Sequence, residues 1–325
     1  MSRLHRAVPI VLAAVLALTG CATASAPTPS PTIDVAAPVT VDNCGVKVTF
    51  DTAPERVVTI KSSTTELLLA LGLGDRIVGT AFQDGPVPAE WADAAASIPS
   101  ISDFVPNEEA VLQLSPDLVF GGWESNFASD GVGERAELES LGVNTYVAPS
   151  ACRSIQPPKL TWDDVFGDIS EVASIFRVDA SALVADQQAR VDALLADQPG
   201  QGRTALWYSS GDDTPYVGAG LGAPELVLET LGLTNIAADV DATWAPLNWE
   251  VVVDADPDVI VLVDATWNTA KDKIVMLEAN PATQNLSAVK AGRYLIVPFA
   301  ATEAGVRSVE ATESLRDQLA VIDGS

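Results

Sequence analysis

Short apolar runs alternate with helical patterns along the chain from residue 56 onward. Runs such as RVVTI at 56–60 and DLVF at 117–120 are mostly apolar, which is typical of strands covered on both faces. Between them, segments such as 65–74 and 133–142 carry apolar residues at helical spacing. The alternation predicts βαβ units, and therefore an α/β fold with central, mostly parallel sheets flanked by helices.

One stretch of this pattern occurs twice. The segment NEEAVLQLSPDLVF at 107–120 returns as NWEVVVDADPDVIV at 248–261, and the helical segment TELLLALGL at 65–73 has a counterpart in PELVLETLGL at 224–233. Two matched segments in the same order predict two lobes built on one architecture.

A connector separates the two copies. Thr161, with Asp164 three places later, begins one helical segment, and a second follows with Leu183, Val184, Val191, Leu194 and Leu195 at helical spacing before a Pro-Gly pair. We expect this second segment to form a single long bridging helix. The expected domains are an N-terminal lobe over 41–160, connecting and bridging helices over 161–200, and a C-terminal lobe over 201–325.

The first forty residues have the composition of a secretion signal and a tether. A basic start and an apolar run over 7–18 predict a signal peptide at 1–20, too short to span a bilayer. The Ala, Pro, Ser and Thr-rich stretch over 21–40 predicts an extended linker. LTGC at 18–21 resembles a bacterial lipobox, which implies lipidation of Cys21 and anchoring at the outer face of the cell membrane. The alternative is ordinary cleavage near ATASA at 22–26, which would discard Cys21.

Charge and histidine content exclude several function classes. The chain has 18 basic and 44 acidic residues, and without the predicted signal, which holds two of the basic ones, its net charge is −28. Such a charge argues against nucleic acid or anionic lipid as a partner. The only histidine is His5. A mature chain without histidine has no Ser-His-Asp triad, no Cys-His dyad and no histidine-ligated zinc site. We therefore expect neither a metal site nor a resident cofactor.

Cys44 and Cys152 are the cysteines that remain beyond the lipobox. Because an extracytoplasmic compartment is oxidising, we expect them to form a disulfide. The bond would join the start of the folded region to a loop more than 100 residues later.

These features together resemble the substrate-binding lipoproteins of iron-siderophore and cobalamin ABC importers, over essentially the whole chain. The most specific segments are APERVVTI at 53–60, TELLLALGLGDRIVG at 65–79 and the doubled segment. The resemblance implies a monomer that delivers its ligand to a dimeric permease driven by a cytoplasmic ATPase. It also implies that Glu109 and Glu250 dock onto permease arginines. Glu108 is a neighbour able to replace Glu109, and the plainer explanation of both acids is stabilisation of a helix start.

Ligands of open α/β sheets bind beyond the carboxyl ends of the strands, so residues at the predicted strand ends are the candidate ligand-binding set. Aromatic side chains there favour stacking on a planar or bulky ligand, and Lys61 and Arg307 are expected to pair with its anionic groups. The set consists of Lys61, Ser62, Phe82, Trp123, Glu124, Asn126, Trp207, Tyr208, Trp244, Trp267, Phe299 and Arg307. Gln83 and Asn268 are neighbours of this set.

The ligand itself is left open among three chemistries: a ferric siderophore, a corrinoid and a deazaflavin coenzyme precursor. Segments GWESNFASDGVGER at 122–135 and NTYVAPSAC at 144–152 resemble an actinobacterial subgroup proposed to import the deazaflavin precursor, a planar ring with a phosphate-bearing tail. Haem is disfavoured by the lack of histidine, although tyrosine can ligate it. The rival class is an extracytoplasmic enzyme using serine or carboxylate chemistry, but no Ser-x-x-Lys or GxSxG motif and no distinct catalytic carboxylate pair is present, so we expect no catalytic residues.

Overall fold

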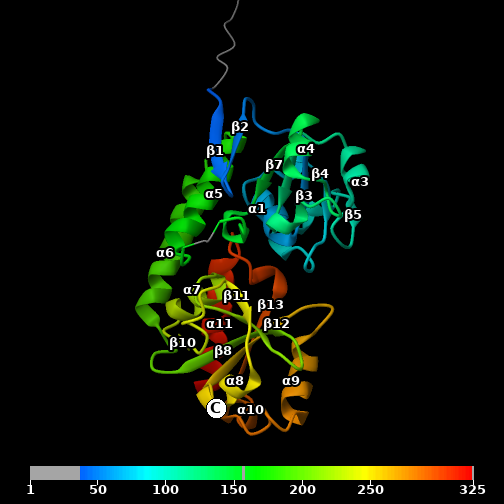
Figure 1. The fold of residues 1–325 in the computed structure, drawn as a ribbon. Helices are drawn as coiled ribbons and strands as arrows, with labels where there is room; N and C mark the ends of the chain where they lie inside the picture. The colour runs from blue at the N-terminus through cyan, green and yellow to red at the C-terminus, as the bar shows by residue number, and fades with distance from the viewer. Residues whose placement is uncertain (1–36, 156–157, 324–325) are drawn as a thin grey trace, which may run out of the picture. The chain divides into compact units, whose positions relative to one another are not determined.

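The computed structural model describes residues 37–155 and 158–323, in which Figure 1 shows two α/β lobes. The predicted signal peptide, Cys21 and most of the predicted tether lie outside the described residues. Within the described part of the chain, no helix is long and apolar enough to cross a membrane.

The N-terminal lobe is built on a five-stranded sheet. All its neighbouring strands are parallel, in the order β5-β4-β3-β6-β7. The strands are β3 (Val57–Ile60), β4 (Ile77–Ala81), β5 (Ser100–Ser102), β6 (Leu118–Gly121) and β7 (Asn144–Val147). The helices are α1 (Ser62–Ala70), α2 (Ala92–Ala95), α3 (Glu108–Leu112) and α4 (Arg135–Ser140). An antiparallel hairpin, β1 (Val39–Asn43) with β2 (Val46–Phe50), precedes the sheet.

The C-terminal lobe has a mixed sheet. The pairs β10–β8, β8–β12 and β12–β13 are parallel, whereas β9 is antiparallel to both β8 and β11. The strands are β8 (Thr204–Ser210), β9 (Tyr216–Gly218), β10 (Thr234–Asn235), β11 (Trp244–Pro246), β12 (Val259–Asp264) and β13 (Tyr294–Pro298). The helices are α7 (Ala223–Thr230), α8 (Trp249–Ala255), α9 (Ala270–Ala279), α10 (Ser287–Lys290) and α11 (Ser308–Asp323). The predicted fold of two lobes with central, mostly parallel sheets is confirmed.

The doubled segment has the same structure in both lobes. Asn107 caps α3 by accepting a hydrogen bond from the amide of Ala110, and Asn248 caps α8 by accepting one from the amide of Glu250, each at 2.9 Å. The aspartates that follow the Pro of each copy also act alike. Asp117 accepts from the amide of Arg56 at the start of β3, and Asp258 accepts from the amide of Thr204 at the start of β8. The Pro-Asp pair therefore ties each copy to the first strand of its lobe.

Two helices, α5 (Trp162–Phe176) and α6 (Ser181–Asp197), connect the lobes. The predicted capping box of Thr161 and Asp164 begins α5. Figure 1 shows α5 beside the β1–β2 hairpin and α6 continuing toward α7. The long bridging helix expected from the sequence is α6, but α5 also contacts both lobes: the Trp162 indole donates to Thr230 Oγ1 at 2.9 Å, and Glu171 accepts from the Tyr146 hydroxyl at 2.5 Å.

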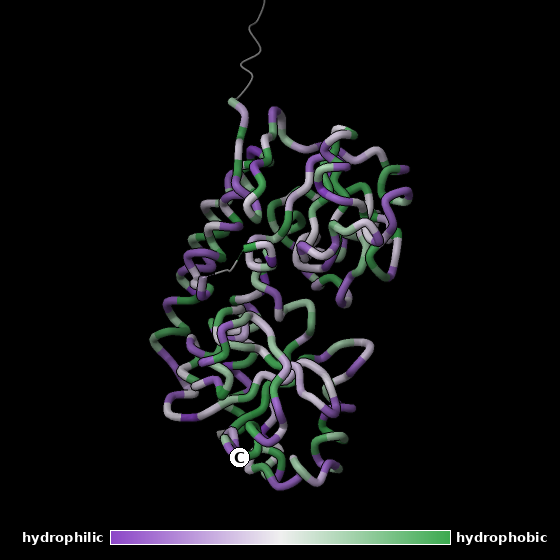
Figure 2. Tube along the Cα trace, in the orientation of Figure 1, coloured by the Kyte–Doolittle hydropathy of each residue, from purple (hydrophilic) through white to green (hydrophobic). Residues whose placement is uncertain are grey.

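In the five-stranded and six-stranded sheets, both faces of the central strands are buried. Neighbouring residues of one strand enter different apolar clusters, as Val57 and Val58 do in β3 and Leu206 and Trp207 do in β8. Figure 2 shows hydrophobic residues following the central strands. The cluster around α5 and α6 also includes Leu226 from α7 and residues near the start of α11, so one apolar cluster extends across both lobes. Because moving the lobes apart would disturb this cluster, we expect only limited hinge motion.

Cys44 and Cys152 form a disulfide in the structure, with 5.3 Å between their Cα atoms. Cys44 lies in the turn of the β1–β2 hairpin, and Cys152 follows β7 in the first lobe. The bond therefore fixes the hairpin to the segment that leads to Arg153.

Candidate functional site

A cavity of about 350 Å³ opens between loops of the two lobes, and we call it the interlobe cavity. Its N-terminal wall contains residues that follow β6 and β7, and its C-terminal wall contains residues at or after the ends of β8, β12 and β13. The carboxyl ends of both sheets thus contribute to one site, as parallel strands predict. Its volume is at the lower end of the roughly 300–1,000 Å³ typical of small-molecule sites.

Five aromatic side chains line the interlobe cavity: Trp123, Tyr216, Trp244, Trp267 and Phe299. The Tyr216 and Trp244 rings stack with an interplanar angle of 12° and 6.3 Å between centroids. This pair arises from register: β11 places Trp244 opposite Gly218 of β9, so Tyr216 is its diagonal neighbour on the same face. Trp267 is 63% exposed and lies edge-on to Phe299, with 5.9 Å between their centroids. An exposed tryptophan at a cavity mouth is available to cover a ligand.

Hydroxyl groups supply most of the remaining polar lining. They belong to Ser125, Ser150, Ser209, Ser210, Thr243 and Thr302, in addition to Tyr216. Hydroxyls both donate and accept, so this wall is suited to a ligand with mixed polar groups.

Among the described residues lining the cavity, Arg153 is the only Lys or Arg, and Glu124 and Glu303 are the acids. The Arg153 guanidinium donates to Thr243 Oγ1 at 3.3 Å. Partial burial alone would raise the pKa of Glu124, but hydrogen bonds from the amides of Arg153 and Ser154 outweigh it and lower this pKa. Burial raises the pKa of Glu303, against the opposing effect of the Lys61 ammonium. The cavity therefore has little net positive charge to offer an anionic ligand.

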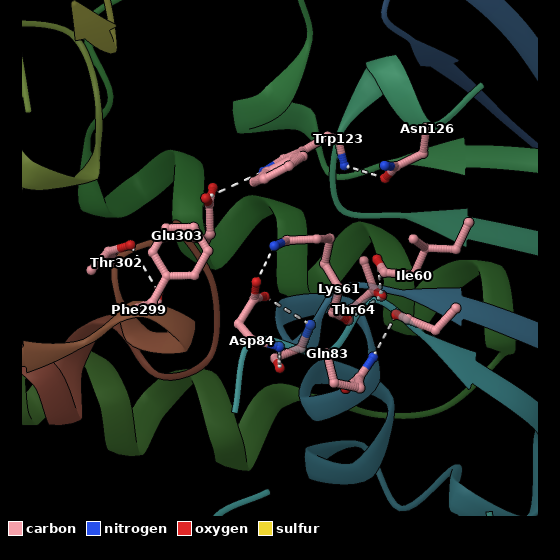
Figure 3. A network of polar contacts seen from close by, with 12 residues as sticks. Ile60, Lys61, Thr64, Gln83, Asp84, Trp123, Asn126, Phe299, Thr302 and Glu303 are labelled. Atoms are coloured by element: carbon pink, nitrogen blue, oxygen red, sulfur yellow. Dashed lines mark hydrogen bonds and ion pairs between the residues drawn. The ribbon is translucent and has the colours of Figure 1, made fainter. Parts of the chain in front are cut away.

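Lys61 lies beneath this site and does not line it. Its side chain is fully buried, and its ammonium pairs with Asp84. Figure 3 shows Lys61 extending toward Asp84, with the rings of Trp123 and Phe299 nearby. Ser62 is buried next to it and donates its amide to Asp84 Oδ2 at 3.2 Å. The expectation that Lys61 pairs with ligand anions is wrong here because Asp84, from the loop after the neighbouring strand β4, already neutralises it.

Arg307 is likewise committed to a carboxylate. Its Nη1 lies 3.3 Å from Oε1 of Glu66 in α1, so the pair links the lobes, and its side chain is 13% exposed. Arg307 is absent from the cavity lining. The sequence placed it at the end of β13, but the chain continues through a short 3₁₀ turn before reaching it, which carries the side chain to the lobe contact.

Trp207 and Tyr208 are core residues. The predicted strand end was set too early, since β8 continues to Ser210 and both rings therefore sit in mid-strand. They point to opposite faces of the sheet, into two apolar clusters, and neither ring is more than 1% exposed. Side chains buried in this way do not reach the interlobe cavity.

Asn126 and Phe82 support the site from behind. Asn126 is buried and its Oδ1 accepts from the amide of Trp123 at 3.0 Å, which holds the loop after β6. Phe82 lies edge-on to Trp123 with 5.5 Å between centroids. Gln83 donates to the carbonyl of Ala81, so it also serves the loop. The structure thus places five residues of the predicted ligand-binding set on the cavity wall: Trp123, Glu124, Trp244, Trp267 and Phe299.

Arg153, Tyr216 and Glu303 line the cavity and were missed in the sequence. Arg153 directly follows Cys152, so the predicted disulfide was a usable signal for a loop fixed near the strand ends. Tyr216 lies in the three-residue strand β9, and Glu303 lies in a loop without periodicity, so the sequence held no signal for either residue. Of the described residues, no three His, Cys, Asp or Glu side chains are grouped to hold a metal ion.

Glu109 and Glu250 occupy matching positions, each the second residue of its helix, and both are exposed. Glu108 is half-buried against Gly133. Exposure therefore favours Glu109 over Glu108 as the freely accessible carboxylate of the first lobe.

Comparison with known proteins relates this architecture to a family. The sequence matches the family described as "Periplasmic binding protein" over residues 57–301. A Bacillus subtilis protein, YvrC, described as an uncharacterized ABC transporter substrate-binding lipoprotein, is 26% identical over 297 residues, covering 87% of this chain and 85% of the relative. A cobalamin-binding protein of Halobacterium salinarum is 30% identical over 273 residues, covering 76% of this chain and 66% of the relative.

Solved structures agree in fold. A periplasmic binding protein from Veillonella parvula superposes with a TM-score of 0.77 at 28% identity, covering 86% of this chain and 97% of its own. A structure from Saccharomonospora viridis, named as an ABC-type Fe³⁺-hydroxamate transport system, gives a TM-score of 0.73 at 32% identity, covering 86% of this chain and 98% of its own.

Proposed function

Since the chain belongs to the periplasmic binding protein family, we propose that it is the extracytoplasmic substrate-binding component of an ABC importer and captures a compact organic ligand in the interlobe cavity. The observation that carries the proposal is the wall of five aromatic rings and several hydroxyls between the lobes. Members of this family bind ligands without converting them, so an enzymatic role on a bulky substrate is set aside.

The charges around the cavity favour a ligand of small net charge. Lys61 and Arg307 are both neutralised by carboxylates, and the cavity lining holds one arginine, Arg153, against two acids, Glu124 and Glu303. A ferric trihydroxamate meets this condition because three singly charged hydroxamates balance one Fe³⁺. The Saccharomonospora viridis relative, named for Fe³⁺-hydroxamate transport, supports the same class. A ferric siderophore of the hydroxamate type is therefore the first candidate ligand.

A deazaflavin coenzyme precursor is the second candidate. The nearly parallel rings of Tyr216 and Trp244 offer a flat surface for a fused ring system. Its phosphate-bearing tail would have Arg153 as its cationic partner. A corrinoid, the ligand named for the Halobacterium salinarum relative, is the bulkiest of the three candidates and would require the widest opening of the lobes.

Delivery would proceed by docking of the exposed Glu109 and Glu250, one on each lobe, onto arginines of two permease subunits coupled to an ATPase. A surface carboxylate meets a guanidinium through two parallel hydrogen bonds, and two separated pairs fix orientation. Lipidation of Cys21 would anchor the protein at the outer face of the membrane, consistent with the lipoprotein description of YvrC. We expect the anchored protein to be a monomer. Limited hinge motion about α5 and α6 would accompany capture and release.

The ligand class is tested first by purifying the exported protein, expressed as the full chain, from its native source with detergent and recording mass and absorbance spectra of what co-purifies. A ferric hydroxamate gives a broad visible charge-transfer band, and a deazaflavin gives a ring absorption in the near ultraviolet to violet. Direct binding is then measured by quenching of tryptophan fluorescence with a ferric trihydroxamate as the probe.

Trp267→Ala should weaken binding of the probe about tenfold, since it removes a stacking surface from the cavity mouth. Phe104→Ala is the matched control, because Phe104 is 73% exposed but does not line the cavity. Equal affinities of the Trp267 and Phe104 variants for the probe would show that the aromatic wall is not the ligand site.

A further inference from the structure

Lys61 has an unusual backbone conformation at the end of β3. Its φ is 81°, a value that side-chain-bearing residues rarely adopt, and it directly precedes α1. Gly122 makes room for it, because a Cβ at Gly122 would lie 2.6 Å from the Cβ of Lys61. The unfavourable backbone conformation of Lys61 thus accompanies an inward-pointing, buried side chain.

The Lys61 ammonium is surrounded by three aromatic rings and one carboxylate. Its Nζ lies 4.3 Å from the ring centroid of Phe82, 3.9 Å from that of Trp123 and 4.8 Å from that of Phe299, and it pairs with Asp84. Contacts at these distances are attractive cation–π interactions, and they are strongest where water is excluded. Lys61 is fully buried, so the condition is met.

The three rings come from both lobes. Phe82 and Trp123 follow β4 and β6 in the N-terminal lobe, whereas Phe299 follows β13 in the C-terminal lobe. A second bond crosses at the same point, since the Trp123 indole donates to Glu303 Oε1 at 3.2 Å (Figure 3). Separation of the lobes at this point would remove Phe299 from the ammonium and break the bond to Glu303.

Trp123 and Phe299 line the interlobe cavity, and Lys61 lies behind them. We propose that Lys61 is the positioning residue of the ligand site: its buried ammonium draws Trp123 and Phe299 together from opposite lobes and so builds the aromatic wall as the lobes close. The effect of Lys61 on ligand affinity rests on the proposed function, whereas the effect of Lys61 on the position of Trp123 does not depend on any ligand.

The test compares Lys61→Met with the double variant Lys61→Met, Asp84→Asn. Methionine retains an unbranched side chain but no charge, and in the single variant Asp84 is left buried without its cation, so unfolding should occur at lower denaturant. The double variant removes both charges and should recover much of that stability. A purely structural ion pair would then leave the site intact, whereas a positioning residue would not.

In the double variant we expect the emission of Trp123 to shift to longer wavelength and to become more accessible to iodide, judged against the same variants carrying Trp123→Phe. Affinity for a ferric trihydroxamate should fall about tenfold or more, because the wall is no longer assembled. Lys290→Met, an exposed lysine in α10, controls for the loss of one positive charge and should match the unaltered protein.

A stable double variant with unaltered Trp123 emission, iodide quenching and probe affinity would overturn the proposal. If the unaltered protein does not bind the probe, the hydroxamate assignment is wrong. The emission and iodide quenching of Trp123 then test the positioning role of Lys61 without a ligand. If the emission shifts while probe affinity holds, Lys61 does not position the ligand wall and the proposal also fails.

Discussion

Glu66 in α1 is a buried carboxyl whose partner comes from the other lobe. It accepts a hydrogen bond from Arg307 at 3.3 Å, and its second oxygen, Oε2, has no hydrogen-bond partner among the described residues. Burial raises the pKa of Glu66 from its ordinary 4.5 to about 7, although Arg307 opposes the shift and Asp84 and Glu310 add to it. The lobe contact therefore contains a group that titrates near neutral pH.

Glu66 should make folding stability depend on pH. Because its pKa is higher in the folded protein than in the unfolded chain, its stabilising contribution is complete below pH 4.5 and is lost as the pH rises through about 7. The full change is about 3 kcal/mol in the free energy of unfolding. Urea unfolding between pH 4.5 and 8 should show this decline, and Glu66→Gln should reduce it.

The exposed Glu137→Gln variant is the matched control and should keep the decline of the unaltered protein. Parallel stability curves for the Glu66 and Glu137 variants across this range would show that Glu66 does not titrate as described.

At the scale of elements, α1 and α7 are copies with one shared feature. Glu66 and Glu225 occupy the same position in TELLLALGL and PELVLETLGL, and both are buried. Glu66 is met by Arg307, and Glu225 by Lys159 at 3.3 Å, a residue of the segment that leads into α5. Each first helix is thus held by a cation from outside its own lobe, and the repeat encodes contacts between the lobes as well as within them.

The elements that the sequence predicted best are the apolar central strands and the helices of the doubled segment. The apolar runs of β3, β6 and β12 are readable because both faces of these strands are covered, and the repeat fixed α3 and α8. Strands β5, β9 and β11 were missed, since three residues are too few to show a period.

The site was predictable where strand ends were visible, as for Trp267 after β12 and Phe299 after β13. Trp207 was misplaced because Ser209 and Ser210 look like a turn but continue β8. The pairing of Lys61 with Asp84 joins two loops that follow different strands, and only the fold sets which partners meet.

The disulfide should contribute to stability through the β1–β2 hairpin. The bond closes a loop between residues 108 positions apart, so Cys44→Ser with Cys152→Ser should lower the free energy of unfolding by about 2 to 5 kcal/mol. Asn43 hydrogen-bonds Val147 on both its amide and its carbonyl, so the hairpin should remain docked in the variant and the fold should survive. Urea unfolding of the chain from residue 22 onward measures the effect.

A thiol assay on the chain from residue 22 onward with both cysteines intact provides the independent check. Without reductant no thiol should react even after unfolding, and two should react after reduction. Two reactive thiols in unreduced, unfolded protein would mean that the bond does not form.

At the scale of the whole molecule, the repeat places one exposed carboxylate at the same helix position in each lobe. Glu109 and Glu250 are not engaged in any ion pair among the described residues, and the α3 and α8 caps that hold them are alike. Both lie on helices rather than in the interlobe cavity, so a change at these positions leaves the ligand wall untouched. Ligand capture and permease docking should therefore be separable by mutation.

Glu109→Ala combined with Glu250→Ala should abolish uptake in cells while affinity of the purified protein for its ligand stays unchanged. Losing one carboxylate alone should give partial loss, because the other pair still guides encounter, and exposed pairs contribute mainly to orientation and association rate. Glu137→Ala with Glu278→Ala is the matched control, since it removes one exposed acid from each lobe and the same total charge. Uptake that persists in the first double variant at the level of this control would refute docking through Glu109 and Glu250, and would return both residues to the simpler role of acids that favour a helix start.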